Sequence, residues 1–289
     1  MHLLRLLTLT LISLCLLIGS ASAHPHIIDV ATKKEISFQD LIGKLEQTRV
    51  VFIGEQHDHA GHHQMQLKII RALAEEQKIA IGLEMFQAED QQALDNWTAG
   101  ISNTKEFRQI YQRNWGWWSL YEPILTFARQ EQIPLVGLNL PRSITRQVAT
   151  SGFSSLDEEQ VNFLGGMTCS VDATYEDFIR RAIGSHGHGS FNFRNFCEAQ
   201  LVWDKAMARY MSSYLKNNPE QTAIVLAGNG HAWKYGIPAQ KTDLGHTDFL
   251  VVLPEVPGRL SREQVTLEDA DYMWLDVGEG SWSATNEEY

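Results

Sequence analysis

The sequence predicts an α/β fold in which a parallel sheet is flanked by helices. Apolar runs at residues 49–53, 79–83 and 223–227 are short and continuous, which is typical of strands covered on both faces. Segments with helical periodicity alternate with strand patterns through the first half of the chain, as the βα units of a parallel sheet require. Residues 142–217 contain no strand pattern, so we expect an inserted all-helical subdomain there.

The N-terminus predicts an exported protein. Arg5 precedes a short apolar stretch that ends in Ala-Ser-Ala, the pattern of a secretory signal peptide cleaved after Ala23. The stretch is shorter than the roughly 20 residues of a membrane-spanning helix. We therefore expect a periplasmic or secreted chain in three parts: a signal peptide at 1–23, an α/β domain at 24–141 plus 218–289, and an inserted helical subdomain at 142–217.

Each element in the first half follows from its periodicity. The helix expected at 62–77 has Met65, Ile69 and Leu73 near one face. Further helices are expected at 89–97, 104–114 and 120–130, and a further strand at 134–138.

The second half is expected to be helical before the sheet resumes. Helices are predicted at 143–150, 157–164, 172–183 and 194–215, strands at 222–227 and at the edge position 248–253, and a small docking patch at 272–275. Asp157 with Gln160, and Asp172, are expected to cap the helices that follow them.

Composition limits the classes of partner. The chain has 35 acidic and 24 basic residues and a formal net charge of −11, so nucleic acid is not an expected partner. Cys169 and Cys197 remain after signal-peptide removal, and an oxidising compartment allows a disulfide between them. Two buried free thiols are the alternative, and both stay open. No C-x-x-C-H motif occurs, which excludes covalently attached c-type haem.

Charged and imidazole side chains follow three of the predicted strands. Glu55 and His57 follow the first, Glu84 the second, and His231 the strand at 223–227. Ligands of open α/β sheets bind outside the carboxyl ends of the strands, so we predict that these side chains share one crevice. Imidazoles and carboxylates can together bind a divalent metal ion. In a metal-dependent hydrolase, Glu55 and Glu84 would be the catalytic candidates.

The other polar residues near this predicted crevice have more ordinary interpretations. His59, His62 and His63 are expected to be solvated residues at the start of a helix. Glu84 has a structural alternative, which is pairing with Arg142. Asn229 is expected to orient His231.

An aromatic cluster and a glycine-rich segment offer a second kind of site. Trp115, Trp117, Trp118 and Tyr121 lie near Tyr111 in the sequence, and such clusters form core packing or line a flat apolar ligand site. A tyrosine phenolate can ligate ferric haem iron, which makes Tyr121 and Tyr111 candidates.

His186 and His188 lie in the sequence Ser-His-Gly-His-Gly-Ser. They are candidates for contacts with haem propionates or a transition metal. A solvated loop is the alternative.

The ordered motifs resemble those of the ChaN family of haem-binding, iron-uptake-associated proteins. The blocks are Gly-Glu-x-His at 54–57, Gly-Leu-Glu-Met-Phe at 82–86, Tyr-Glu-Pro-Ile-Leu at 121–125, Leu-Asn-x-Pro-Arg at 138–142, Ala-Gln-x-x-Trp-Asp at 199–204 and Gly-Asn-Gly-His at 228–231. This family belongs to a superfamily with TIKI/TraB proteins and erythromycin esterases. The resemblance implies haem bound between two subunits of a homodimer through a tyrosine, here Tyr121, and an outer-membrane haem or iron uptake system as partner.

Two functional classes follow. The first is a periplasmic protein that binds haem for iron uptake. The second is a divalent-metal-dependent hydrolase that uses the Glu/His crevice. We prefer the haem-binding hypothesis because the resemblance is closest there.

Overall fold

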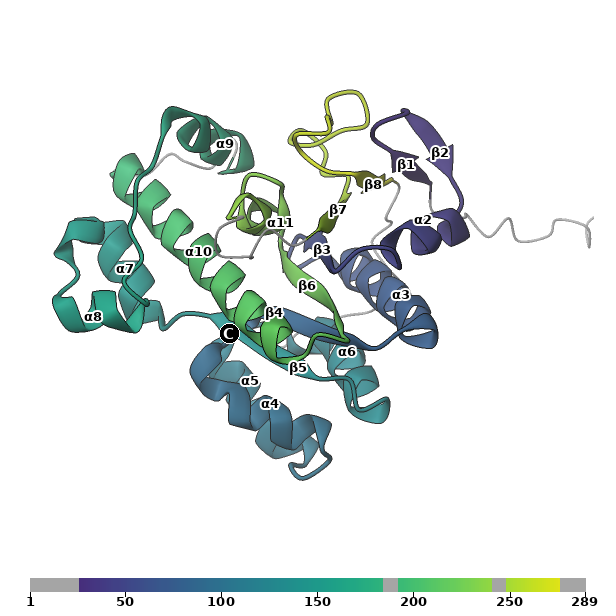
Figure 1. The fold of residues 1–289 in the computed structure, drawn as a ribbon, viewed down its shortest axis with the longest axis horizontal. Helices are drawn as coiled ribbons and strands as arrows, with labels where there is room; N and C mark the ends of the chain where they lie inside the picture. Colours follow the sequence, from purple (N-terminus) through teal and green to yellow (C-terminus); the bar gives the residue numbers. More distant parts are fainter. Residues whose placement is uncertain (1–25, 184–191, 241–247, 276–289) are drawn as a thin grey trace, which may run out of the picture.

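A mixed eight-stranded sheet forms the centre of the molecule (Figure 1). The computed structural model describes residues 26–183, 192–240 and 248–275. The strands are β1 (Ile27–Asp29), β2 (Lys34–Ile36), β3 (Val50–Glu55), β4 (Ile79–Gln87), β5 (Leu135–Asn139), β6 (Thr222–Gly228), β7 (Phe249–Pro254) and β8 (Tyr272–Trp274). Their order is β2-β1-β8-β7-β3-β6-β4-β5. Pairing is parallel from β8 to β5 and antiparallel on both sides of β1, so the predicted α/β class is confirmed.

Helices cover both faces of this sheet, and α10 runs along its front in Figure 1. The helices are α2 (Phe38–Leu45), α3 (Ala60–Glu76), α4 (Gln91–Thr98), α5 (Thr104–Asn114), α6 (Trp118–Gln130), α7 (Arg142–Ser151), α8 (Glu158–Phe163), α9 (Ala173–Ile183), α10 (Phe193–Asn217) and α11 (Asn229–Ala232). Short 3₁₀ turns are η1 (Ala88–Asp90), η2 (Phe153–Ser155) and η4 (Ile237–Ala239). The helices from α2 to α6 contribute to the core on one face, while α9, α10 and α11 contribute to the core on the other.

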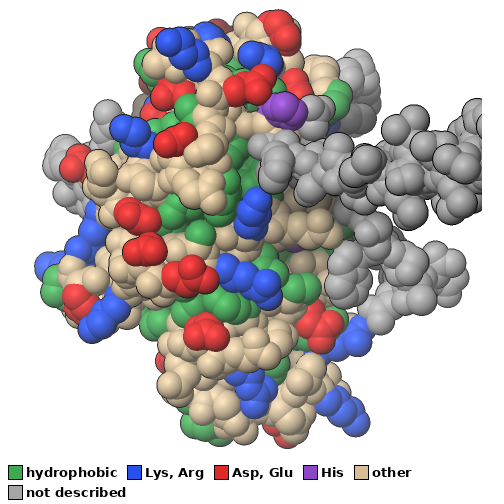
Figure 2. Space-filling model, turned by 90° about the vertical axis from the view of Figure 1, so that its right-hand side faces the viewer, with side chains coloured by type: hydrophobic (Ala, Val, Ile, Leu, Met, Phe, Trp, Pro, Cys, Tyr) green, Lys and Arg blue, Asp and Glu red, His purple; other side chains and the backbone are tan. Residues whose placement is uncertain are grey.

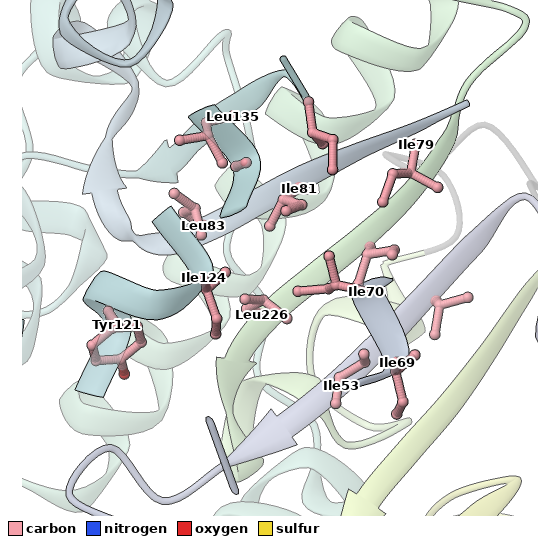
Figure 3. Close-up of a cluster of buried hydrophobic side chains, with 14 of the residues drawn as sticks. Ile53, Ile69, Ile70, Ile79, Ile81, Leu83, Tyr121, Ile124, Leu135 and Leu226 are labelled. Atoms are coloured by element: carbon pink, nitrogen blue, oxygen red, sulfur yellow. The ribbon is translucent and has the colours of Figure 1, made fainter. Parts of the chain in front are cut away.

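The first core shows why the apolar runs form strands. Side chains alternate between the faces of a strand, so Ile53, Ile81 and Leu226 all point to the side covered by α3 and α6. Figure 3 shows these residues packed against Ile69 and Ile124 from the two helices. The apolar residues between them pack on the opposite face, which explains why the runs are continuously apolar.

The second core joins the region 142–217 to the sheet. Met207 and Met211 of α10 share a buried cluster with Val225 of β6. At Gly82 of β4, an added Cβ would lie 2.9 Å from the Met211 sulfur, so α10 packs very close to the sheet. A smaller apolar cluster involves Leu140, Ile144, Leu164, Val202 and Ala206. The division of the chain into an α/β domain and an inserted subdomain stays a prediction.

Most predicted elements occur within a few residues of their expected bounds. The Asp157 carboxylate and the Gln160 side chain form a reciprocal cap at α8, and Asp172 accepts a hydrogen bond from the Tyr175 backbone, so both cap predictions are confirmed. Among the described residues, no helix is long and apolar enough to cross a membrane. The predicted signal peptide lies outside the described residues.

The prediction was wrong at the far side of the sheet. The strand β7 is not an edge, because it pairs with β3 on one side and β8 on the other. The expected docking patch at the tail is β8 itself. The strands β1 and β2 were missed, because three-residue strands are too short to show a period of two.

The two cysteines are free thiols in the structure, so the disulfide alternative is not realised. The Cys169 thiol donates a long hydrogen bond to the backbone carbonyl of Glu198. Burial raises the pKa of Cys169 to about 12 and that of Cys197 to about 11, so neither is a reactive thiolate near neutral pH.

One face of the molecule carries both signs of charge. Figure 2 shows Lys and Arg side chains interspersed with Asp and Glu on the coloured part of this face, with hydrophobic side chains between them. The coloured surface there has no gathered basic stripe of the kind that nucleic-acid binding uses. The exclusion of nucleic acid stays a prediction.

The contact between β4 and β5 yields a stability prediction. An added Cβ at Gly137 would lie 2.6 Å from the backbone oxygen of Gln87, which cannot move without disturbing the sheet. We expect Gly137→Ala to lower the free energy of unfolding by about 1–3 kcal/mol, measured by urea denaturation. The control is Gly43→Ala in α2, where no atom lies within 4 Å and a gain of about 0.5–1 kcal/mol is expected. Wild-type stability in Gly137→Ala would contradict the tight contact.

Candidate functional site

The four strand-end residues meet in one cleft, as the sequence predicted. Glu55 ends β3, His57 follows it, Glu84 lies in β4, and His231 lies in α11 directly after β6. All four line a cleft of about 400 Å³ at the carboxyl end of the parallel strands. The same cleft is lined by Trp115, Trp203, Trp233, Val256, Arg259 and Leu260.

Gly228 lies next to both Glu84 and His57. It ends β6, which lies between β3 and β4 in the sheet. Its backbone N–H donates to Glu84 Oε2 at 2.7 Å. An added Cβ there would lie 2.8 Å from His57 Cε1 and 3.0 Å from His57 Nε2. Glycine is therefore required for the imidazole of His57 to approach the strand end and the Glu84 carboxylate together.

Glu55 is a buried carboxylate that accepts three hydrogen bonds. The Tyr121 hydroxyl and His57 Nδ1 (2.8 Å) both reach Oε1, and Gln66 Nε2 donates to Oε2 at 2.7 Å. Burial alone raises a carboxyl pKa, but the imidazoles of His63 and His57 and the Tyr121 hydroxyl outweigh it and lower the pKa of Glu55 to about 2. The carboxylate is therefore ionised, and it holds His57 with Nδ1 as the donor.

His57 is the more accessible histidine of the cleft. Its side chain is 32% exposed, and its ring lies edge-on to Trp115 and stacked on Trp117, with centroids 5.0 Å and 6.2 Å away. Burial opposes protonation, but the hydrogen bond to Glu55 and the charges of Glu84 and Glu55 raise the pKa of His57 to about 9. The imidazole is therefore a cation at neutral pH whose Nε2 side faces the cleft.

A second carboxylate–histidine pair faces the first. His231 Nδ1 lies 2.7 Å from Asp204 Oδ1 of α10, and Asp204 Oδ2 accepts from the Tyr175 hydroxyl at 2.5 Å. The opposite nitrogen, His231 Nε2, lies 3.8 Å from Glu84 Oε1. Burial lowers the tendency of His231 to charge, yet Glu84 and Asp204 raise its pKa. Two Tyr–carboxylate–His chains therefore lie near Glu84: His231 is in contact with its carboxylate, and His57 interacts with its charge.

Several predicted partners were wrong. The residue that orients His231 is Asp204, while both amide atoms of Asn229 lack a hydrogen-bond partner among the described residues. Arg142 does not pair with Glu84, because its guanidinium donates to the backbone carbonyl of Asn114.

Two of the histidines at the start of α3 were also misassigned. His62 and His63 are buried rather than solvated, and His63 hydrogen-bonds Gln66 and the His57 carbonyl. His62 accepts from the Gln56 backbone N–H. These imidazoles contact the backbone of Gln56 and His57 and so support the Glu55–His57 pair.

The two candidate tyrosines lie behind the cleft. Tyr121 is 1% exposed with its hydroxyl donated to Glu55, and Tyr111 is fully buried with its hydroxyl donated to the Gly116 carbonyl. Burial and the charge of Glu55 raise the pKa of both phenols above the ordinary value of 10. This arrangement does not favour either phenolate as an iron ligand. The predicted contacts of His186 and His188 lie outside the described residues.

The aromatic cluster is divided between core and cleft. Tyr111, Tyr121 and Trp118 belong to the buried core on the α3 side. Trp115 and the 41% exposed Trp117 instead flank His57, so the predicted aromatic site and the predicted polar crevice are one place. Asp204, Gln66 and Tyr175 were missed as site residues, and only Asp204 had a sequence signal, since it belongs to the Trp-Asp block at 203–204.

The divalent-metal prediction receives no support from this geometry. Among residues 26–183, 192–240 and 248–275, no group of three or more His, Cys, Asp and Glu side chains could hold a metal ion.

Comparison with known proteins identifies the family. Residues 41–240 match the model of the family described as "Haem-binding uptake, Tiki superfamily, ChaN". The chain belongs to the ChaN family. Both strand-end motifs and all three cleft tryptophans lie within the matched residues. The matched region therefore supplies most of the cleft lining, while Val256, Arg259 and Leu260 lie beyond it.

One similar solved structure shares the fold, and further similar proteins are more distant. ChaN of Campylobacter jejuni, solved with cofacial haem, is 22% identical with a TM-score of 0.66, and the match covers 88% of this chain and 97% of that one. The erythromycin esterase EreC in its open conformation is 17% identical, with a TM-score of 0.47 over 79% of this chain and 76% of that one. The Arabidopsis thaliana protein RETICULATA-RELATED 5, chloroplastic, is 22% identical over 81% of this chain. This chain spans only 35% of the plant protein.

The raised pKa of His57 predicts a pH dependence of stability in this ChaN family member. The ordinary pKa of 6.5 rises to about 9 in the folded state, so folding favours the protonated imidazole. The resulting stabilisation is fully present below pH 6.5 and is lost as the pH rises through 9. We expect the unfolding free energy to fall more steeply over pH 6.5–9 in the wild type than in His57→Gln, measured by urea denaturation. Parallel curves for the two proteins would contradict the raised pKa.

Proposed function

We propose that this chain is an exported haem-binding protein that holds haem for iron acquisition in its strand-end cleft. The observation that carries the proposal is His57, which presents an imidazole to an indole-lined cleft in a member of the ChaN family. The family is described by haem-binding uptake, and its Campylobacter jejuni relative was solved with cofacial haem. The cleft lies within the range of about 300–1,000 Å³ for small-molecule sites.

The donor set of the cleft fits haem. Because Glu55 is ionised and accepts from His57 Nδ1, the opposite nitrogen Nε2 is left for the cleft. It would hold iron after releasing its proton, with the Nδ1–carboxylate hydrogen bond found in metal-ligating histidines. Gly228 leaves space beside this nitrogen, because the Cβ of any larger residue at that position would lie 3.0 Å from His57 Nε2. The buried indole nitrogen of Trp115 has no partner in the described part of the chain. Haem would be cargo here, held by His57 and by flat contacts with the indoles.

Trp117 adds a flat surface beside His57. Its backbone φ of 52° lies in the left-handed region, which is rarely occupied by bulky residues, and its side chain is 41% exposed. Such conformations cluster at functional sites and persist only where the surrounding structure holds them. Here the conformation places an indole parallel to the His57 ring, with an angle of 26° between the planes. This partly exposed indole next to His57 supports a planar ligand at that histidine.

The cellular setting is part of the proposal. The Ala-Ser-Ala site after an apolar stretch supports export through a signal peptide cleaved after Ala23. We propose that the mature chain receives or delivers haem in the periplasm in association with an outer-membrane uptake system, and that it does so as a homodimer. Tyr121, the ligand suggested by the resemblance, and His57 are then distinct candidates for the residue that would hold the iron.

A haemin titration tests both the function and the ligand. We expect a saturable Soret change in the wild type, with His57→Ala binding haemin at least tenfold more weakly and with an altered spectrum. Tyr121→Phe is expected to keep the wild-type spectrum, because its phenol is bonded to Glu55. The matched control is His26→Ala, an exposed histidine bonded to Glu35 outside the cleft. A wild-type spectrum in His57→Ala together with a changed one in Tyr121→Phe would assign the iron to the tyrosine.

Hydrolysis is the second candidate, favoured by the two carboxylate–histidine pairs around Glu84. In ester hydrolysis, Glu84 Oε1 would take a proton from water while the water oxygen attacks the carbonyl carbon. The carbon–oxygen bond to the leaving group then breaks as the His57 cation donates a proton to the leaving oxygen, and the proton held by Glu84 passes to His57, which restores both groups. Glu55 is excluded as the base, because both of its oxygens already accept hydrogen bonds, so it positions His57.

Turnover of a probe ester separates this candidate from simple binding. With 4-nitrophenyl acetate, we expect Glu84→Gln to lower kcat/KM by roughly 100-fold, within the range for loss of a general base. Glu89→Gln, on the exposed η1 turn, is the control and should match the wild type. If both candidates use one cleft, haemin should also inhibit competitively. A wild type no faster than Glu84→Gln would rule out catalysis by this carboxylate.

A further inference from the structure

Arg259 places a positive charge in the lining of the cleft, and no described residue of the site pairs with it. It lies in the segment between β7 and β8 and lines the same cleft as His57 and Trp115. Its backbone is held in place, since Val256 and Leu260 form an antiparallel bridge and the Arg259 N–H donates to the Val256 carbonyl. Both bridge residues are at most 5% exposed. Arg259 therefore lines the cleft from a turn whose backbone is held in place.

Arg259 differs from neighbouring arginines in having no charged partner among the described residues. Arg262, three residues later, lies 3.1 Å from Glu35, and Arg181 lies 2.7 Å from Asp269. No carboxylate or carbonyl in the described ranges accepts a hydrogen bond from the Arg259 side chain. A guanidinium at the wall of a cleft without a carboxylate partner is poised to bind an anion from solution.

The other charges of the cleft are already paired. The carboxylate of Glu55 is matched by His57, and Asp204 by His231. Glu84 accepts from Gly228 and faces His231. Among the described residues of the cleft, Arg259 is thus a cation that an anionic group of a ligand can bind without displacing a carboxylate partner. Its planar fork of N–H donors matches a carboxylate in particular.

The apolar wall defines the rest of the ligand. The indole N–H groups of Trp203 and Trp233 donate to Asn139 and Asp269, so these side chains are fixed by their polar edges. Together with Trp115, Val256 and Leu260, they give the cleft an apolar lining. This lining suits an aromatic body, while the guanidinium suits an acidic substituent.

We propose that Arg259 is the carboxylate-recognition residue of the cleft, which selects planar aromatic ligands that carry carboxylate side chains. The proposal rests on the proposed function, because haem with its two propionates is a ligand of this class. A charge-assisted hydrogen bond of this kind corresponds to roughly a tenfold or greater change in affinity.

The test compares haemin with its dimethyl ester, in which both carboxylates are neutral. We expect the wild type to bind haemin roughly tenfold more tightly than the ester, measured by Soret titration in one detergent buffer. Arg259→Gln should bind the two ligands equally, at the affinity of the ester for the wild type. Arg259→Lys should recover part of the preference. Arg262→Gln, which removes an arginine paired with Glu35, is the matched control and should behave as the wild type.

The outcomes separate the two proposals. If the wild type binds haemin and its ester equally, Arg259 does not recognise carboxylates, although haem binding stands. An undiminished preference for haemin in Arg259→Gln overturns the proposal in the same way. If the wild type shows no saturable haemin binding, the proposed function itself fails, and the ligand class inferred here fails with it. Thermal unfolding of each variant shows whether a loss of binding reflects a loss of fold.

Discussion

The hydrogen bonds accepted by the buried carboxylate of Glu55 hold the cleft together. A charged group without water requires donors on its oxygens, and here they come from Tyr121 of α6, Gln66 of α3 and His57. Each donor belongs to a different segment, so the charge ties the end of β3 to two helices on one face of the sheet. The same contacts fix the ring of His57 with Nε2 toward the cleft.

The cleft draws on both faces of the sheet. Glu55 follows Ile53 on the side of α3 and α6, whereas Glu84, one residue after Leu83, points to the side of α10 because strand side chains alternate. The two carboxylates therefore serve opposite histidines instead of repelling each other at one point. Gly228 lets the two sides meet, since a side chain there would collide with His57.

The aromatic side chains and the carboxylate–histidine pairs of this cleft suit two functions, which are binding of a planar ligand and proton transfer. The indoles and the accessible Nε2 side of His57 suit a planar ligand such as haem, while Glu84 beside the imidazoles of His57 and His231 suits proton transfer. Both functions use the same space, so a bound planar ligand and a reacting ester would exclude each other. The membership of the chain in the ChaN family favours haem as the physiological occupant.

The sequence by itself determined the α/β class and the meeting of Glu55, His57, Glu84 and His231. Both follow from local pattern, because apolar runs mark buried strands and parallel strands bring their carboxyl ends to one edge. Only the tertiary structure decided which groups hold these side chains. Asp204 rather than Asn229 orients His231, because α10 crosses the sheet and brings a distant carboxylate to the ring. The partners of a buried charge depend on packing between distant segments, which sequence periodicity does not encode.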